Sequence, residues 1–107
     1  MDFSDVIDPN GKPVLPSHPG QLLRMEFLEP LGISQYRLAK SIGVTEARIS
    51  EICAGKRAIT ADTGLRLDRF FGLSTGYWLG LQASHDTAHA RVALHDVLQR
   101  IEPLVHP

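Results

Sequence analysis

The sequence lacks the features that mark membrane, secreted and disulfide-rich proteins. None of its apolar runs approaches the roughly 20 residues that cross a bilayer. The acidic start of the chain, with Asp2 and Asp5, has neither the basic residues nor the apolar stretch of a secretory signal. A lone cysteine, Cys53, excludes an internal disulfide framework and fits a reducing compartment. These absences predict a small cytoplasmic protein that stays out of membranes.

A further absence concerns β-structure. No segment shows sustained alternation of apolar and polar residues with a period of two, the pattern of a half-buried strand. The chain has 107 residues, of which 43% are hydrophobic and 21% charged, as in ordinary globular domains. This length fits one domain and is too short for two. We therefore expect a single all-α domain.

The charge is nearly balanced overall but unevenly distributed along the chain. A formal net charge of −1 is unusual for a protein that binds nucleic acid. Residues 34–72, however, carry seven basic and four acidic side chains, a net of +3, while both flanks are net negative. A basic middle between acidic flanks can present a positive face to phosphate. The charge pattern therefore permits nucleic-acid binding without requiring it.

Proline, glycine and hydroxyl side chains divide the chain into a flexible N-terminal arm and five helices. Residues 1–16 contain three prolines and an Asn-Gly pair, which favour loops, so the folded domain should span residues 17–107. The first helix should begin near Pro19 and end at Pro30-Leu31-Gly32. Each later helix should follow a hydroxyl cap: Ser34, Thr45, Thr60 and Ser74. The expected spans are 35–42, 46–54, 61–71 and a long last helix, 75–101.

Residues 34–55 have the pattern of a helix-turn-helix. Two short capped helices meet at Gly43, whose backbone freedom the turn needs. Ala39 is small enough to let the second helix approach the first, and Val44 and Ile49 would anchor the second helix in the core. Two capped helices in any bundle can show the same pattern. The surrounding helices and the basic loop that follows favour DNA binding over a purely structural bundle.

The residues expected to touch the DNA backbone begin each helix of the motif or follow it. Gln35 and Tyr36 start the first helix, where N–H groups and the helix dipole favour a phosphate oxygen. Thr45 caps the second, or recognition, helix and can bond its own backbone or a phosphate. Lys56 and Arg57 come directly after the recognition helix and are expected to hold backbone phosphates.

The outward side of the recognition helix carries the candidates for reading bases. Glu46, Ala47, Ser50 and Glu51 are small or polar enough to enter a major groove. Arg48 can read guanine or clamp a phosphate, and its position leaves this open. For the charged members a solvated surface is the plainer alternative. Since two acids on this helix would repel phosphates, a single chain should bind modestly and dimerisation is expected.

Three blocks of the chain resemble one known family. They are His18-Pro-Gly-Gln-Leu-Leu-Arg-Met-Glu-Phe-Leu-Glu-Pro-Leu-Gly-Ile-Ser-Gln-Tyr-Arg-Leu-Ala-Lys, Gly55-Lys-Arg-Ala-Ile-Thr-Ala-Asp-Thr-Gly-Leu-Arg-Leu and Phe71-Gly-Leu-Ser-Thr-Gly-Tyr-Trp-Leu-Gly-Leu-Gln-Ala. The resemblance, over about residues 17–90, is to the HigA-type antitoxins of the lambda-repressor-like helix-turn-helix group. It implies a homodimer that binds double-stranded operator DNA at its own promoter and neutralises a HigB-type toxin, a ribosome-dependent mRNA endonuclease. The alternative is a stand-alone helix-turn-helix regulator without a toxin partner.

The sequence departs from this family at several places. Gly64 stands where the family usually has alanine, and it either permits a close helix contact or weakens the fourth helix. The segment after Ala90 and the arm 1–16 also diverge. Toxin contacts are therefore not assigned to residues.

A stripe of apolar residues follows Ala90 at helical spacing: Leu94, Val97, Leu98 and Ile101. The stripe can pack back on the first helix or pair with its symmetry mate. A helix that extends beyond its core must bury such a stripe elsewhere, which favours a dimer interface.

One histidine pattern suggests a different class of protein. His85 and His89 are spaced i, i+4 beside Asp86, which echoes a zinc hydrolase helix. A catalytic zinc site needs a third protein ligand. On one continuous helix His95 would point in a different direction from His85 and His89, so it would not supply that ligand. Cys53 has no nearby base that would activate a thiol. We therefore expect no enzyme, no metal and no cofactor, and read the histidines as structural.

Overall fold

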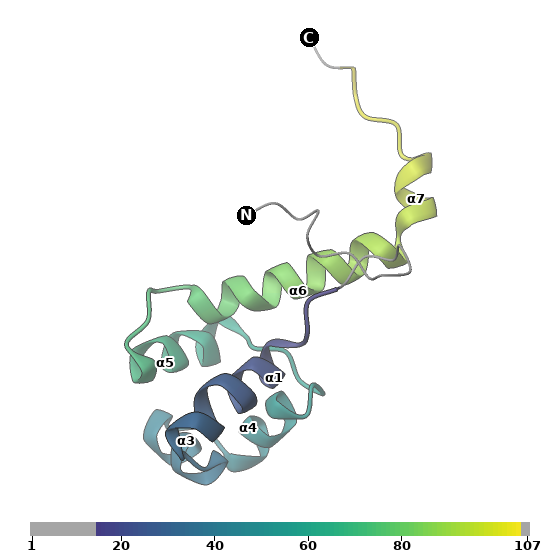
Figure 1. Cartoon of the computed structure of the whole chain (residues 1–107). Coiled ribbons are helices and arrows are strands. Elements are labelled where there is room, and N and C mark those ends of the chain that lie inside the picture. Colours follow the sequence, from purple (N-terminus) through teal and green to yellow (C-terminus); the bar gives the residue numbers. More distant parts are fainter. Residues whose placement is uncertain (1–14, 106–107) are drawn as a thin grey trace.

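The computed structural model describes residues 15–105, and this part of the chain is helical without strands (Figure 1). The all-α prediction is confirmed for these residues. The arm predicted for residues 1–16 lies outside them, apart from its last two residues. The elements are α1 (Pro19–Leu22), the π-helix η2 (Leu23–Leu28), α2 (Glu29–Leu31), α3 (Gln35–Ile42), α4 (Glu46–Cys53), α5 (Ala61–Phe71), α6 (Tyr77–Ala93) and α7 (His95–Arg100).

The first helical unit begins and ends as predicted. His18 caps it, since its Nδ1 accepts a hydrogen bond of 2.9 Å from the Gly20 N–H, and Pro19 takes the first position. Pro30 lies inside α2, and the unit ends at Gly32, with φ 66°. The preceding turns form the π-helix, which the periodicity did not predict. A proline ring clashes with the carbonyl four residues earlier in a regular α-helix, and the wider π turn relieves this clash.

The helix-turn-helix forms where the sequence places it. The Ser34 hydroxyl accepts a hydrogen bond of 3.0 Å from the Arg37 N–H and starts α3. The Thr45 hydroxyl accepts one of 3.1 Å from the Arg48 N–H and starts α4. Between them Gly43 has φ 74°, a left-handed conformation that favours glycine. These local caps confirm the predicted starts of both helices.

The last predicted helix differs from the structure at its start and in its middle. Ser74 does not cap it; α6 instead begins after Gly76, whose N–H donates to Asp68 Oδ2 on α5 at 2.8 Å. The helix is also interrupted at Leu94, with φ −99° and ψ 11°, and resumes as α7. The side chains on both sides of this break are exposed, so no packing holds the segment straight.

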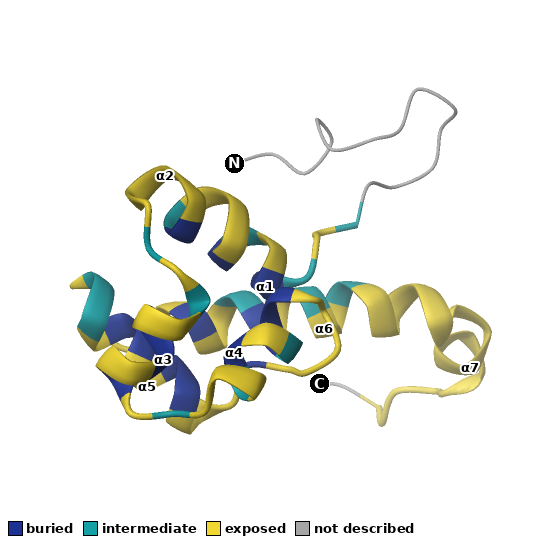
Figure 2. Ribbon diagram, turned by 90° about the horizontal axis from the view of Figure 1, so that it is seen from below, coloured by how far each residue is buried: buried dark blue, intermediate teal, exposed yellow. Residues whose placement is uncertain are grey.

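The core lies between the first helical unit (α1 and η2), α3, α4, α5 and the first turns of α6 (Figure 2). Its largest fully buried side chains are Trp78, Leu23, Leu38, Ile49, Ile52, Ile59 and Leu67. α1 approaches α4 so closely that a Cβ on Gly20 would collide with the carbonyl of Ile52. Gly64 is different, because a Cβ there would make ordinary contacts with Leu79 and Ile59. The second glycine is therefore not required by a close helix contact.

None of the helices between residues 15 and 105 is both long and apolar enough to cross a membrane.

Candidate nucleic-acid interface

The recognition helix α4 buries one side and exposes the other. Ile49 and Ile52 are fully buried in the core. Glu46, Ala47 and Ser50 lie exposed on the opposite side. The polar side predicted to enter a DNA groove therefore faces outward.

The predicted backbone contacts also lie on the surface. Tyr36 is exposed, and the Nζ atom of Lys40 lies 5.4 Å from the centre of its ring. Gln35 is half-buried at the start of α3. Thr45 is exposed, and because its hydroxyl oxygen accepts the capping bond, its O–H can still donate to a phosphate. The start of each helix thus presents a donor to solvent.

Arg48 has a partner that its position in the sequence did not indicate. Its Nη1 lies 3.8 Å from Asp62 Oδ1 on α5, and the side chain is 35% exposed. The same oxygen accepts a hydrogen bond of 2.8 Å from Arg66 Nε. An exposed ion pair of this length contributes little, so Arg48 can leave it for a base or a phosphate.

Two other candidates bind each other. Arg57 Nε donates to Glu51 Oε2 at 2.7 Å, so one predicted base contact and one predicted phosphate contact form a single ion pair. Lys56 is exposed, and among the described residues it has no carboxylate within ion-pair distance. Of the two basic residues after α4, Lys56 is the one whose charge is not offset by a bound carboxylate.

Arg66 on α5 supports the motif in a way that the sequence analysis missed. Its Nη1 donates to the carbonyl oxygen of Ile42 at 2.7 Å and, at 3.4 Å, to that of Gly43. These carbonyls end α3 and would otherwise lack a helical donor. The guanidinium thereby ties α5 to the turn between α3 and α4. No local signal marks this contact, since 24 residues separate the partners.

The histidine pattern of α6 joins α6 to the start of the domain. The His85 ring lies 4.2 Å from the His89 ring and 5.2 Å from the His18 ring. Asp86 accepts from His85 at 2.9 Å, and His89 Nε2 lies 3.0 Å from the Pro16 carbonyl oxygen. Within residues 15–105 no three potential ligands are grouped to hold a metal ion. The contacts give these histidines a structural role.

Two titrating groups of this cluster have shifted pKa values. Burial and the neighbouring His85 lower the pKa of His18, while Asp86 acts in the opposite direction. Hydrogen bonds from His85 and Gln82 lower the pKa of Asp86. Burial also raises the pKa of the Cys53 thiol, which keeps it protonated and unreactive.

The predicted dimer residues are all exposed in the single chain. Leu94, Val97, Leu98 and Ile101 keep between 42% and 61% of their surface exposed. They lie on α7 and at its two ends, beyond the part of α6 that packs on the core (Figure 2). The stripe does not pack back on α1, and its surface is available to another chain.

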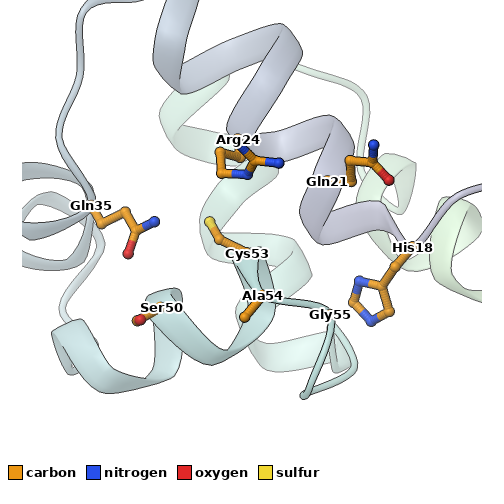
Figure 3. Close-up of a pocket in the computed structure, with 8 residues that line it drawn as sticks. All are labelled: His18, Gln21, Arg24, Gln35, Ser50, Cys53, Ala54 and Gly55. Carbon is orange, nitrogen blue, oxygen red and sulfur yellow. The ribbon is translucent and has the colours of Figure 1, made fainter.

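A polar cleft of about 590 Å³ lies between the first helical unit and α4 (Figure 3). Gln21 and Arg24 line one side, and Ser50 and Gln35 line the other. The sequence pattern assigned no role to Gln21 or Arg24. Their positions on the polar side of the first helix were the only signal available.

Two short helices joined by a glycine turn, the second with an outward polar side, define the helix-turn-helix class of DNA-binding proteins. Residues 25–78 match the family model described as helix-turn-helix. The chain is 48% identical over 79 residues to virulence-associated protein I of Dichelobacter nodosus, an alignment covering 73% of each. It is 31% identical to antitoxin HigA-1 of Vibrio cholerae, over 79% of this chain and 80% of that protein.

A solved structure gives the same result. Antitoxin HigA of Pseudomonas aeruginosa, solved with the higBA promoter, superposes with a TM-score of 0.78 and is 37% identical. The match covers 84% of this chain and 99% of that chain. The protein belongs to the helix-turn-helix family and, within it, to the HigA group.

Proposed function

We propose that this chain is the antitoxin of a type II toxin–antitoxin pair that represses its own operon by sequence-specific DNA binding. The observation that carries the proposal is the outward polar side of α4, on a backbone that matches a HigA antitoxin solved with its promoter at a TM-score of 0.78. The partner would be a HigB-type mRNA endonuclease, and the pair would act in the cytoplasm. The chain itself would be a binding protein rather than an enzyme.

The residues of α4 would divide the work of recognition. Glu46 and Ala47 lie in its first turn, where a carboxylate can accept from a cytosine amino group and a methyl group can touch thymine. Ser50 lies one turn further on the same exposed side. Arg48 reaches a base or a phosphate only after leaving Asp62, and Glu51 reaches a base only after leaving Arg57.

The remaining candidates would position the duplex. Gln35, Tyr36 and Thr45 place donors at the starts of α3 and α4, and Lys56 and Arg57 follow α4. Contacts of this kind fix register and orientation but carry no sequence information.

A dimer would place two recognition helices on successive turns of the major groove. In such complexes the half-sites lie roughly 34 Å apart. The exposed stripe of α7 is the proposed interface, because it is apolar and unpaired within the described chain. Residues 17–107 would then combine a DNA-binding core with a C-terminal dimerisation segment.

Operator binding is tested by fluorescence anisotropy with a duplex from the region upstream of the gene and a scrambled duplex. Wild-type protein should bind the first far more tightly than the second. Ser50→Ala and Glu46→Ala should each cost about 1–3 kcal/mol on the operator and little on the scrambled duplex. Gln99→Ala, at an exposed position of α7, is the matched control. Equal binding of both duplexes by wild-type protein would overturn sequence-specific repression.

The toxin half of the proposal is tested separately. The adjacent reading frame is co-expressed with this chain, and complex formation and growth are measured. A stable complex and relief of growth arrest are expected. Operator binding without either result would leave the stand-alone regulator as the function.

A further inference from the structure

The cleft between the first helical unit and α4 has the composition of an anion site. Among the residues that line it, Arg24 is the permanent cation, and no carboxylate is present. Gln21, Gln35 and Ser50 add neutral hydrogen-bond donors. Figure 3 shows Arg24 on the side of the cleft opposite Ser50, with Cys53 between them. A negatively charged group entering the cleft would meet donors from both sides.

The position of the cleft indicates which anion this would be. Gln35 and Ser50, which line one side, are also proposed contacts of the DNA backbone and bases. A duplex lying on the exposed side of α4 would therefore run one strand past the mouth of this cleft. The anion that such a strand presents is a backbone phosphate.

The charges on α4 itself make an additional cation useful. Glu46 is exposed beside the proposed groove, and the charge of Glu51 is already matched by Arg57 at 2.7 Å. Arg48 is engaged by Asp62 at 3.8 Å. Arg48 is the one basic residue of the recognition helix, so α4 itself offers the phosphates beside it a single cation. Arg24, which also begins in an exposed ion pair, adds a second cation from a neighbouring element.

Arg24 can leave its own ion pair to take this role. Its side chain is 45% exposed, and its partner is Glu29, whose Oε1 lies 3.5 Å from Nη1. Glu29 is itself 59% exposed, and ion pairs of this kind contribute little to stability. The guanidinium can exchange the carboxylate for a phosphate, which it can bind with two parallel hydrogen bonds.

We propose that Arg24 binds a phosphate of the operator backbone across this cleft, as a positioning contact outside the helix-turn-helix itself. The proposal rests on the proposed operator binding. Because a phosphate contact carries no base information, Arg24 would add affinity to every duplex alike. Glu29 would act as its competitor in the unbound protein.

The first test compares Arg24→Gln with wild-type protein on operator and scrambled duplexes at several salt concentrations. The variant should bind both about tenfold more weakly at 0.1 M salt, and the slope of log affinity against log salt should fall by about one contact, roughly 0.9. Arg69→Gln, an exposed arginine in the last turn of α5, is the control and should change neither quantity. An unchanged affinity and slope for Arg24→Gln would overturn the contact.

A double-mutant cycle separates a direct contact from the general field of the protein. Glu29→Gln should tighten binding about twofold in the wild-type background, because it releases Arg24. In the Arg24→Gln background the same change should have no effect. An equal gain in both backgrounds would mean that Glu29 acts through its charge alone, and it would overturn the proposed competition.

A third test locates the phosphate. Single phosphates of the operator are replaced by neutral methylphosphonates, and binding of both proteins is measured. At one position in each half-site wild-type protein should lose about tenfold, and Arg24→Gln should lose nothing further. Equal losses for both proteins at every position would overturn the contact. So would Arg24-dependent binding of inorganic phosphate with no effect on operator. If wild-type protein fails to bind any duplex, the proposed function itself fails.

Discussion

The two ends of α6 belong to different kinds of surface. At its start, Trp78 and Gln82 are buried, and Gln82 Oε1 accepts a hydrogen bond of 2.8 Å from the Ile59 N–H. Beyond Ala88 every described residue is exposed, through α7 to residue 105. Figure 1 shows α6 extending away from the other helices toward α7. One helix is thus held by the core at one end and unsupported at the other.

This difference separates what stabilises the fold from what is available to partners. The core-facing half is held by close helix contacts and by buried hydrogen bonds. The distal end of α6 and the α7 segment that follows it present Val92, Leu94, Val97, Leu98 and Ile101 to solvent, and exposed apolar groups at such density mark interaction surfaces. Substitutions in the first region should change the free energy of unfolding. Substitutions in the second should change association.

The largest expected effect tests the closest contact of the core. Gly20→Ala should lower the free energy of unfolding by about 3 kcal/mol, because its Cβ would collide with the Ile52 carbonyl. Gly64→Ala is the matched control at a buried helical glycine with room for a methyl group, and it should raise stability by about 0.5–1 kcal/mol. Urea denaturation measures both. Equal effects of the two substitutions would contradict the close approach of α1 to α4.

The anchored start of α6 gives the next prediction. Asp68 is buried and accepts hydrogen bonds from the N–H groups of Gly76 at 2.8 Å and Trp78 at 3.2 Å. Asp68→Asn removes the charge and turns an amide donor toward one of these donors, which should cost about 2 kcal/mol. Asp62→Asn, at a mostly exposed side chain, should cost well under about 1 kcal/mol. Thermal unfolding of both variants checks this. If Asp68→Asn lowered stability no more than Asp62→Asn does, Asp68 would not be stabilising the start of α6.

The distal half should respond in association rather than in folding. Val97→Asp should weaken the proposed dimer by about 2 kcal/mol, roughly thirtyfold in dissociation constant, with little change in unfolding of the monomer. Gln99→Asp on the same helix is the control for added charge. Light scattering over a dilution series measures the dissociation constant. If Val97→Asp leaves it unchanged, the interface lies elsewhere.

The smallest effect concerns the histidines that join α6 to α1. Because the pKa of His18 is lowered on folding, the unfolded chain takes up its proton first, and stability should fall as pH drops below about 6.5. The lowered pKa of Asp86 contributes stability that is lost only in more acidic solution, below its ordinary value of 3.8. His18→Asn keeps a capping acceptor but does not titrate.

The measurement is the melting temperature between pH 7.5 and 5.5. The slope should flatten in His18→Asn and remain as in wild type in His95→Asn, a control at an exposed position of α7. His85, His89 and Asp86 surround His18 and stay in place in both variants. Identical slopes in all three proteins would show that His18 does not contribute.

Much of the fold could be predicted because its signals are local. The caps at Ser34, Thr45 and Thr60 each bond an N–H three residues later, so the sequence contains both partners. Ser74 also has a hydroxyl side chain but does not cap α6. The N–H groups at the start of α6 instead donate to Asp68, which lies on α5. The break at Leu94 has no glycine or proline to mark it. Periodicity therefore predicted a longer helix than the one that forms.

The sequence predicted which residues of the candidate interface are exposed, but not which ion pairs they form. Helical periodicity placed Glu46, Ala47 and Ser50 on the exposed side of α4, as the structure does. It did not show that Arg48 lies beside Asp62, because this pairing depends on how α5 packs against α4. The cleft beside Arg24 likewise exists only once two helices meet.

The amino-acid sequence by itself determined where most of the helices start, where the turn of the motif lies and which side of α4 is polar. Capping bonds and helical periodicity act over at most a few neighbouring residues, so both are written in the primary structure. Packing decided which arginines are engaged, that Gly20 is indispensable and that the first helix contributes a cation beside α4. These properties join residues 14 to 32 positions apart, and only the folded chain brings them together.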